Sequence, residues 1–298
     1  MLFKKIKIED KDIIDKYVAK HKFKTYEYSF TTLYLWRNMC NVEYAIVDDV
    51  LIIKKQQVGK GEYFMVPVGC DKEKLPEIVE KLKEYKSKSY DMQNLFRDVE
   101  EDFVEEFKDI YGDKVEYMED IDNFDYVYDT EKLINLSGKK YHSKKNHYNT
   151  FVSTYSYKIA DMKDEKVARD CIEFDKFWNE NKNSSTAQLD YELDGTIDLI
   201  ENRHALDIEG MAVYVDDKVV GFTIGEKMNE DMVIIHIEKG DFNYKGVYAF
   251  INKTFLETYY KDVKCVNREE DLGVVGLRKA KSSYHPVKLE KKFIVNIL

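Results

Sequence analysis

The chain has 298 residues and a formal net charge of -10 at pH 7, with 57 acidic against 47 basic residues. Hydrophobic residues make up 44% and aromatic residues 14%, which excludes a largely disordered chain and allows one large domain or two ordinary ones. The longest apolar runs are strand-length and the start has no apolar leader, so we expect a cytoplasmic protein without an integral membrane segment.

The first half of the sequence predicts alternating helices and strands. Apolar periodicity indicates helices over 8–21, 29–39, 75–87 and 98–112. Asp98 is the expected N-cap of the fourth helix and Gly112 its end. Alternating apolar residues predict strands over 42–53, where Asp48 and Asp49 form a turn between two strands, and over 62–67, 114–120 and 124–129.

The second half predicts an antiparallel meander followed by β-α-β-α-β. We expect a helix within 136–151, between the halves, and an amphipathic helix over 164–181. Three strands follow over 210–217, 218–228 and 232–240. The remaining elements are a helix (246–260), a strand (263–267), a helix (271–284) and a last strand (287–298). This order predicts an α/β fold with a mixed sheet in which strand 232–238 is central.

Charge is distributed unevenly along the chain. Residues 91–131 hold 16 acids and 3 bases, whereas 137–149 hold four lysines, two histidines and no acid. A second basic run, 264–292, has 8 bases and 4 acids. Such asymmetry indicates separate surfaces, one of which would meet an anionic ligand, although each lysine alone fits an ordinary solvated face. The four cysteines show no paired or metal-like spacing, so we expect reduced thiols and no metal site.

Three segments resemble one bacterial family, that of the C-terminal domain of phosphatidylglycerol lysyltransferase. They are "LSGKKYHSKKNHYNTF", "HIEKGDFNYKGVYAFIN" and "VNREEDLGVVGLRKAKSSYHP", of which the last is the most specific. The resemblance implies two tandem GNAT-like α/β domains, which we expect at 1–130 and 131–298. Named members transfer lysine from aminoacyl-tRNA to a lipid headgroup and carry a large membrane region, to which this sequence shows no counterpart.

The resemblance also implies a donor-binding loop. GNAT enzymes hold the pyrophosphate of acyl-CoA on a Q/R-x-x-G-x-G/A loop that opens a helix. The aligned residues here include Asn243, Gly246, Val247 and Tyr248. Gly246 fits, but Asn243 replaces the long polar residue and Tyr248 stands where a small residue is usual, which weakens the expectation of acyl-CoA. Gly246 would alternatively be an ordinary loop glycine before a helix.

Candidate proton-transfer residues lie on strand 232–240. Strict alternation would place Ile234, His236 and Glu238 on one face and Ile235, Ile237 and Lys239 on the other. By resemblance, the end of this strand carries the base that deprotonates the acceptor, and Glu238 and His236 have suitable chemistry. The alternative is a polar strand end with a hydrogen-bonded histidine.

The last motif supplies further candidates. Arg278, Lys281 and Tyr284 recur at i, i+3 and i+6 on the expected helix. The resemblance implies that a tyrosine here, Tyr284, protonates the leaving group. Arg268 follows a strand, where its guanidinium could grip a carboxylate or phosphate. Alternatively Arg268 pairs internally with Glu269, Glu270 or Asp271.

The basic segment itself permits two interpretations. Its four lysines are Lys139, Lys140, Lys144 and Lys145, with His142 and His147 interleaved. They could form a wall that attracts the phosphates of a CoA donor or of a tRNA acceptor end, with Lys144 and Lys145 as donor-binding residues. Alternatively they neutralise the acidic 91–131 stretch.

These observations favour an acyl- or aminoacyltransferase. The expected reaction moves an acyl group from aminoacyl-tRNA or acyl-CoA to an amine or hydroxyl acceptor, and no other cofactor is firmly implied. The competing hypothesis is a non-catalytic GNAT-fold protein that binds an anionic ligand or regulatory partner. A nucleic-acid module ranks third because the chain is acidic and has no reader motif. The sequence leaves the oligomeric state open.

Overall fold

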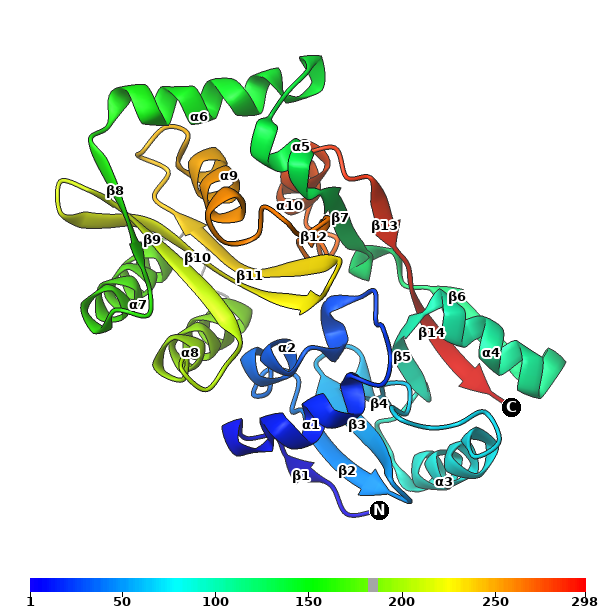
Figure 1. The fold of residues 1–298 in the computed structure, drawn as a ribbon. Helices are drawn as coiled ribbons and strands as arrows, with labels where there is room; N and C mark the ends of the chain where they lie inside the picture. Colours follow the sequence, from blue (N-terminus) through cyan, green and yellow to red (C-terminus); the bar gives the residue numbers. More distant parts are fainter. Residues whose placement is uncertain (182–186) are drawn as a thin grey trace. The chain divides into compact units, whose positions relative to one another are not determined.

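A computed structural model describes residues 1–181 and 187–298 (Figure 1). The chain forms two compact units. Unit 1 comprises Met1–Phe124 together with Glu290–Leu298, and unit 2 comprises Asp125–Leu289. Each unit is built on a seven-stranded mixed sheet flanked by helices.

Unit 1 has the strand order β1-β2-β3-β4-β5-β14-β6. Strands β4 and β5 run parallel and pair at Phe64 and Phe96, and α3 connects them. Its strands are β1 (Lys4–Lys5), β2 (Glu43–Val47), β3 (Val50–Gln57), β4 (Gly61–Phe64), β5 (Phe96–Glu100), β6 (Val115–Glu119) and β14 (Lys292–Ile297). Its helices are α1 (Lys11–Val18), α2 (Phe30–Leu35), α3 (Leu75–Lys88) and α4 (Glu101–Tyr111).

Helix α4 begins later than the sequence predicts. Asp98 is not its N-cap but a residue of β5, with a φ of 57°, and its buried carboxylate lies 3.2 Å from the Lys55 ammonium. The ion pair keeps Asp98 within the sheet, so the helix starts only at Glu101. Gly112 ends the helix with a φ of 56°, as predicted.

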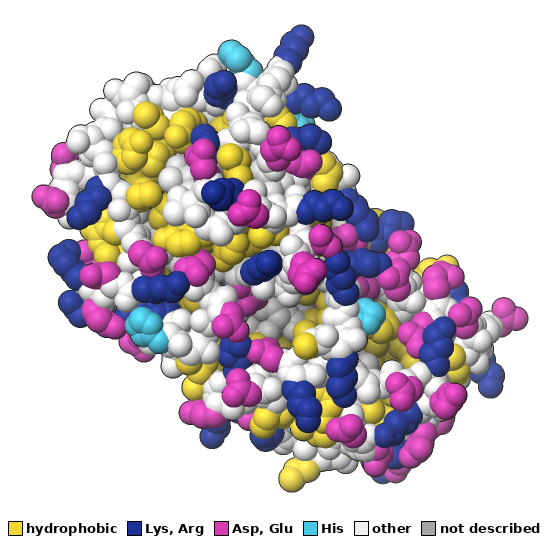
Figure 2. Space-filling model, in the orientation of Figure 1, with side chains coloured by type: hydrophobic (Ala, Val, Ile, Leu, Met, Phe, Trp, Pro, Cys, Tyr) yellow, Lys and Arg dark blue, Asp and Glu magenta, His cyan; other side chains and the backbone are white. Residues whose placement is uncertain are grey.

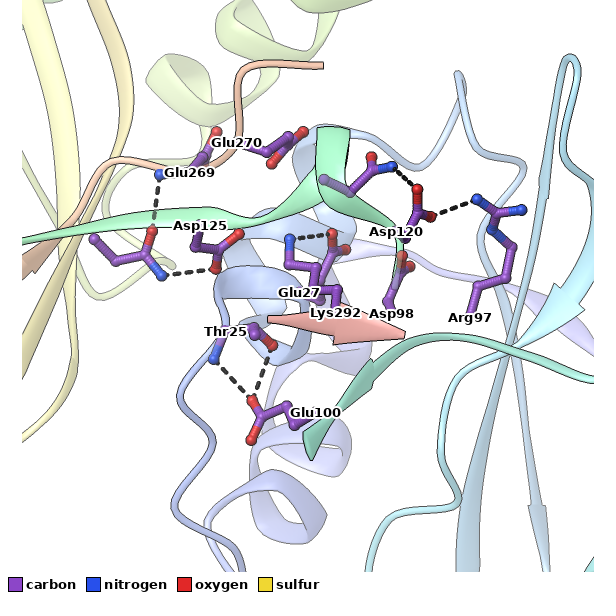
Figure 3. Close-up of polar contacts among 12 residues, drawn as sticks. Thr25, Glu27, Arg97, Asp98, Glu100, Asp120, Asp125, Glu269, Glu270 and Lys292 are labelled. Carbon is purple, nitrogen blue, oxygen red and sulfur yellow. Dashed lines mark hydrogen bonds and ion pairs between the residues drawn. The ribbon is translucent and has the colours of Figure 1, made fainter. Parts of the chain in front are cut away.

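The C-terminal strand β14 completes unit 1 rather than unit 2. It pairs with β5 and β6, and Phe293 and Val295 lie in the apolar core of unit 1. Lys292 is fully buried and its ammonium lies 3.0 Å from the Glu27 carboxylate (Figure 3). Glu27 also lies 2.6 Å from the Lys55 ammonium, so its carboxylate holds the strand that carries Lys292 against β3 in a buried charge network, and removing that carboxylate would leave buried cations uncompensated.

Unit 2 has the order β13-β7-β12-β11-β10-β9-β8, a mixed sheet with β11 at its centre, as expected. The last expected strand, 287–298, is divided: Lys288–Glu290 joins this sheet, whereas Lys292–Ile297 pairs in unit 1. Helix α6 packs on α9 within this unit. The strands are β7 (Asp125–Asp129), β8 (Tyr157–Asp161), β9 (Ile208–Val215), β10 (Lys218–Asn229), β11 (Met232–Gly240), β12 (Cys265–Asn267) and β13 (Lys288–Glu290). The helices are α5 (Thr130–Asn135), α6 (His142–Thr154), α7 (Glu165–Glu180), α8 (Ala187–Glu201), α9 (Val247–Tyr259) and α10 (Val275–Ser282).

The two sheets repeat one topology with an exchange of strands. Read from β8, the sheet of unit 2 has four successive antiparallel strands, then a fifth strand that is parallel to the fourth. A sixth strand follows, which comes from another part of the chain, and the last is an edge strand. Unit 1 has the same order when it is read from β1. The sixth strand of unit 2 is β7, which follows β6 in the chain, and that of unit 1 is β14, which follows β13. The expected division at 130/131 therefore differs from the structure: β7 pairs with β12, and the chain returns to unit 1 at Glu290.

Candidate active site

The centre of the unit 2 sheet opens between two parallel strands. β11 pairs with β12 from Met232 to Ile234 and then continues to Gly240 without further pairing to β12. On its other side β11 stays paired with β10. The edge of β11 beyond Ile234 and the turn after β12 therefore bring their side chains into one space.

A β-bulge at His236 sets the direction of these side chains. Ile235 pairs with Gly225 and Ile237 with Ile224, so His236 is the extra residue of β11. After the bulge, Glu238 faces α9 and accepts a hydrogen bond from Asn252 Nδ2 (3.3 Å). The alternation expected from the sequence is thus wrong, because the bulge shifts Glu238 to the face opposite Ile234.

The opposite face of β11 confirms this shift. Lys239 points to α7 and α8, where its ammonium lies 2.6 Å from Asp175 and 2.8 Å from Glu192. Ile235, by contrast, belongs to the apolar core formed with α9. Ile235 and Lys239 were expected on the same face and lie on different ones.

Four predicted residues gather where the strands separate. Arg268 Nη2 donates to Glu238 Oε1 at 2.9 Å, so the internal partner of Arg268 is Glu238 and not one of the three acids that follow it. The guanidinium lies 4.8 Å from the centre of the Tyr284 ring. The Lys144 ammonium, from α6, lies 4.0 Å from the same centre. We call Glu238, Arg268, Tyr284 and Lys144 the central cluster.

Tyr284 is buried, its three charged neighbours in the central cluster are half-buried, and the cluster carries excess positive charge. Burial raises the pKa of Tyr284 to about 12, so its phenol stays protonated at neutral pH. Burial, reinforced by the nearby Arg268 charge, lowers the pKa of Lys144 to about 8. Arg268 Nη1 is buried and has no hydrogen-bond partner among the described residues. Two cations thus share one carboxylate, Glu238, an arrangement that suits an anionic ligand.

His236 lies beside this cluster but is fully engaged. Its Nε2 lies 3.0 Å from Glu226 Oε1 and its Nδ1 lies 3.1 Å from Glu269 Oε1. Burial alone would lower the pKa of His236, but the bonds to Glu226 and Glu269 raise it to about 9. A charged imidazole with both nitrogens bonded has no free acceptor, so His236 fits the hydrogen-bonded alternative better than a base.

The predicted donor loop is filled by protein. Gly246 has a φ of 89°, and a Cβ there would come within 2.0 Å of the His147 carbonyl oxygen of α6. Val247 is buried, and the Tyr248 hydroxyl donates to the Gly240 carbonyl at 3.0 Å. Asn243 Nδ2 donates to Asp241 at 2.8 Å. These residues do not fit a pyrophosphate cradle, since the close approach that the glycine permits is to α6.

The other predicted cations hold the turn around the cluster. Arg278 binds Asp271 through two bonds of 2.8 and 2.9 Å. Lys281 donates to the carbonyl oxygens of Arg268 and Glu270. Lys145 is exposed. None of the four basic-segment lysines forms an ion pair within residues 1–181 and 187–298, so no contact supports their role as an internal counterweight.

Two residues that contact the central cluster, Asn252 and Tyr128, were not among the predicted site residues. Asn252 lies on the face of α9 that meets Glu238, and Tyr128 of β7 lies with its ring centre 5.8 Å from the Arg268 guanidinium. An asparagine within an apolar helix could have signalled Asn252. Nothing in the sequence places Tyr128, since β7 was expected in the other domain.

The family defined as phosphatidylglycerol lysyltransferase, C-terminal, matches residues 19–296. The chain belongs to this family. No helix within the described parts of this family member is both long and apolar enough to cross a bilayer.

Related proteins agree with this family and with its fold. A conserved protein of unknown function from Bacteroides thetaiotaomicron is 31% identical, with a TM-score of 0.89 over 99% of both chains. The C-terminal domain of a putative lysylphosphatidylglycerol synthetase from Agrobacterium fabrum is 13% identical, with a TM-score of 0.66 over 96% of this chain and 91% of that one. A tandem GNAT protein from the clavulanic acid biosynthesis pathway is 8% identical, with a TM-score of 0.54 over 99% of this chain and 97% of that one. The fold is therefore two tandem GNAT-like domains.

One curated relative matches only in part. An uncharacterized protein of Mycoplasmoides gallisepticum is 27% identical over 177 residues, which cover 58% of this chain. The match spans 56% of that protein's own length.

Proposed function

We propose that unit 2 transfers an aminoacyl group from an activated donor to an amine or hydroxyl acceptor. The observation that carries this proposal is the central cluster, which sets a carboxylate, a protonated phenol and two cations where β11 and β12 separate. The chain's family is named for the C-terminal domain of a lysyltransferase, and this supports the proposed class of reaction.

Each member of the cluster has a chemical task in this proposal. The acceptor nucleophile attacks the ester carbonyl carbon of the donor and gives its proton to Glu238, whose oxygens each retain a lone pair beside the bonds from Arg268 and Asn252. When the tetrahedral adduct collapses, the carbon–oxygen bond to the donor breaks and Tyr284 protonates the departing oxygen. Arg268 and Lys144 stabilise the negative charge of the adduct or of a donor phosphate.

Aminoacyl-tRNA is the donor that we favour over acyl-CoA. The loop that would hold the CoA pyrophosphate is closed by the His147 carbonyl and by Tyr248. A tRNA acceptor end needs no such loop, and its phosphodiesters suit the exposed lysines Lys139, Lys140 and Lys145.

One observation favours a second candidate, a GNAT-fold protein that binds an anion without reaction. Both oxygens of Glu238 already accept hydrogen bonds, and one of these belongs to an ion pair with Arg268. If Arg268 never releases Glu238, the site would bind a phosphate or carboxylate but would have a weak base.

A transfer assay separates the candidates. Purified protein is incubated with radiolabelled lysyl-tRNA or labelled acetyl-CoA, each with phosphatidylglycerol vesicles or with a free primary amine. We expect label to pass from lysyl-tRNA to an acceptor faster than spontaneous deacylation and no transfer from acetyl-CoA. Transfer from acetyl-CoA alone would overturn the donor assignment. Binding of deacylated tRNA without any transfer would favour the binding protein.

A further inference from the structure

Strand β6 forms one edge of the unit 1 sheet, because the strand order ends with it. The amide of Asp120, just after β6, donates to the Lys292 carbonyl oxygen of β14 at 2.8 Å. Bonding residues alternate along an antiparallel pair, so every second residue before Asp120 also faces β14. The N–H and C=O groups of Val115, Tyr117 and Glu119 point the other way, and no described residue pairs with them.

Apolar side chains are exposed along this edge on both faces of the sheet. Tyr117 is 48% exposed and lies on the α4 side, where the Lys108 ammonium is 4.1 Å from the centre of its ring. Met118 points to the opposite face and is 61% exposed, as is Ile121 just beyond the strand. An edge strand with unpaired backbone groups and exposed apolar side chains is a template for another strand.

The charge around this edge is strongly negative. Residues 101–122, which include α4 and β6, hold 10 acids and 2 bases, a balance of -8 in a chain whose net charge is -10. Glu101, Asp113 and Glu116 are exposed and form no ion pair with any residue that the structure describes. Helix α4 packs against β6, and magenta side chains are frequent over α4, at the right of Figure 2. The open edge of β6 therefore lies in a surface with a large excess of negative charge.

We propose that β6 pairs with an extended segment, rich in lysine or arginine, of a partner protein. The segment would add an eighth strand to the unit 1 sheet, held by main-chain hydrogen bonds to the three outward-facing residues of β6. Its cationic side chains would meet the acids of α4 and β6, and its apolar side chains would cover Met118 and Tyr117. The pairing involves no acyl transfer, so it stands independently of the function proposed for unit 2.

Other occupants fit the edge less well. A second copy of this chain would add its own acidic β6 to the same edge, and like charges on paired strands are destabilising. RNA and anionic lipids are repelled by the same excess of acids. A basic helix would satisfy the acids but would leave the outward N–H and C=O groups unpaired. Only an extended basic segment satisfies both the charge and the backbone.

Fluorescence anisotropy with a labelled heptapeptide of alternating lysine and valine tests the proposal. We expect this peptide to bind at low salt and to release as salt rises, and the matching glutamate–valine peptide not to bind. Glu116→Lys should weaken binding roughly fivefold or more, because it reverses an exposed charge beside the paired strand. Glu9→Lys makes the same change at an exposed residue of unit 1 outside α4 and β6, and should leave binding unchanged.

Hydrogen exchange separates strand pairing from attraction between charges alone. In the free protein we expect the amides of Glu116 and Met118, which face β14, to exchange slowly and those of Val115, Tyr117 and Glu119 to exchange fast. The bound peptide should slow the three outward-facing amides roughly tenfold or more. A peptide held only by charge would leave their exchange rates unchanged.

Two variants at one position test the backbone bonds further. Tyr117→Ala removes the ring, whereas Tyr117→Pro removes the ring and the outward N–H. This N–H does not bond β14, so proline is compatible with the edge strand. We expect Tyr117→Pro to bind the peptide roughly fivefold or more weakly than Tyr117→Ala does.

The proposal is overturned if the wild type does not bind the lysine–valine peptide at low salt, or if Glu116→Lys binds it as well as wild type does. It is also overturned if the peptide binds without slowing exchange at the outward-facing amides. Slow exchange of these amides in the free protein, together with a dimer that forms as concentration rises, would assign the edge to a second copy and overturn the proposal as well.

Discussion

At the scale of single residues, the bulged His236 shows how one side chain ties separated strands together. It bridges Glu226 of β10 and Glu269 of the turn after β12. Its pKa is raised from 6.5 to about 9, so the stabilising charge is fully present below pH 6.5 and is lost as pH rises through 9. We therefore expect the free energy of unfolding to fall by about 3 kcal/mol over that range because of this group.

Chemical denaturation at pH 6, 7.5 and 9.5 measures this effect as the difference between wild type and His236→Gln. The difference should shrink as pH rises, because the wild type loses its ion pairs while the glutamine has none to lose. A His236→Gln difference that stays constant or grows with pH would contradict the assignment.

Lys144 predicts a pH dependence of ligand binding. Its pKa is lowered to about 8, so its positive charge disappears between pH 7 and 9. Binding of deacylated tRNA, followed by fluorescence anisotropy, should weaken by up to about tenfold over this range if the charged amine contacts phosphate. Lys144→Arg should remove most of that dependence, because arginine stays charged. The exposed neighbour offers the control: Lys145→Arg should keep the wild-type profile, and an unchanged profile in Lys144→Arg would exclude Lys144 from the site.

At the scale of elements, the loop before α9 is fixed by its contact with α6. Gly246→Ala would force a Cβ against the His147 carbonyl and hold alanine at a φ of 89°, so we expect a loss of roughly 2–4 kcal/mol of stability. Gly59 has a similar φ of 82° but nothing within 4 Å. Gly59→Ala should therefore cost only about 1 kcal/mol, which isolates the clash from the backbone strain. Equal losses in the two variants, measured by denaturant unfolding, would show that the α6 contact is unimportant.

Most elements could be predicted from periodicity, but not their local irregularities. Strand β11 and helix α9 appear where the sequence predicts them. The bulge at His236 could not be predicted, because the alternation of apolar residues through 232–240 is compatible with a regular strand. The bulge has a large consequence, because it directs the Glu238 carboxylate, and not the His236 imidazole, into the central cluster.

At the scale of the whole molecule, the exchanged strand β14 predicts a dependence of unit 1 on the far end of the chain. Deleting 290–298 removes Phe293 and Val295 from the core and leaves Glu27 without the Lys292 ammonium. We expect hydrogen exchange to show lost protection in β5 and β6 while β9 to β11 remain protected. Deletion of the exposed Leu298 alone is the control and should change neither unit. Loss of protection in unit 2 first would contradict this division of the chain.

The tandem architecture could be predicted from the sequence, and the domain boundary could not. The order of helices and strands and three motifs indicated two GNAT-like domains. The exchange of β7 and β14 depends on which sheet accepts each strand. The choice is made by long-range contacts such as the ion pair of Lys292 with Glu27, which no local pattern reveals.

In the proposed function, the central cluster of Glu238, Arg268, Tyr284 and Lys144 performs the acyl transfer. The most direct measurement is the single-turnover rate of transfer from labelled lysyl-tRNA in Glu238→Gln and Tyr284→Phe, at donor concentrations that saturate each protein. We predict that each variant transfers roughly 10²- to 10⁴-fold more slowly, while the dissociation constant for donor changes little. Tyr90→Phe, a change at a fully exposed tyrosine of unit 1, serves as the control and should transfer at the wild-type rate. Wild-type rates in both cluster variants would contradict the account.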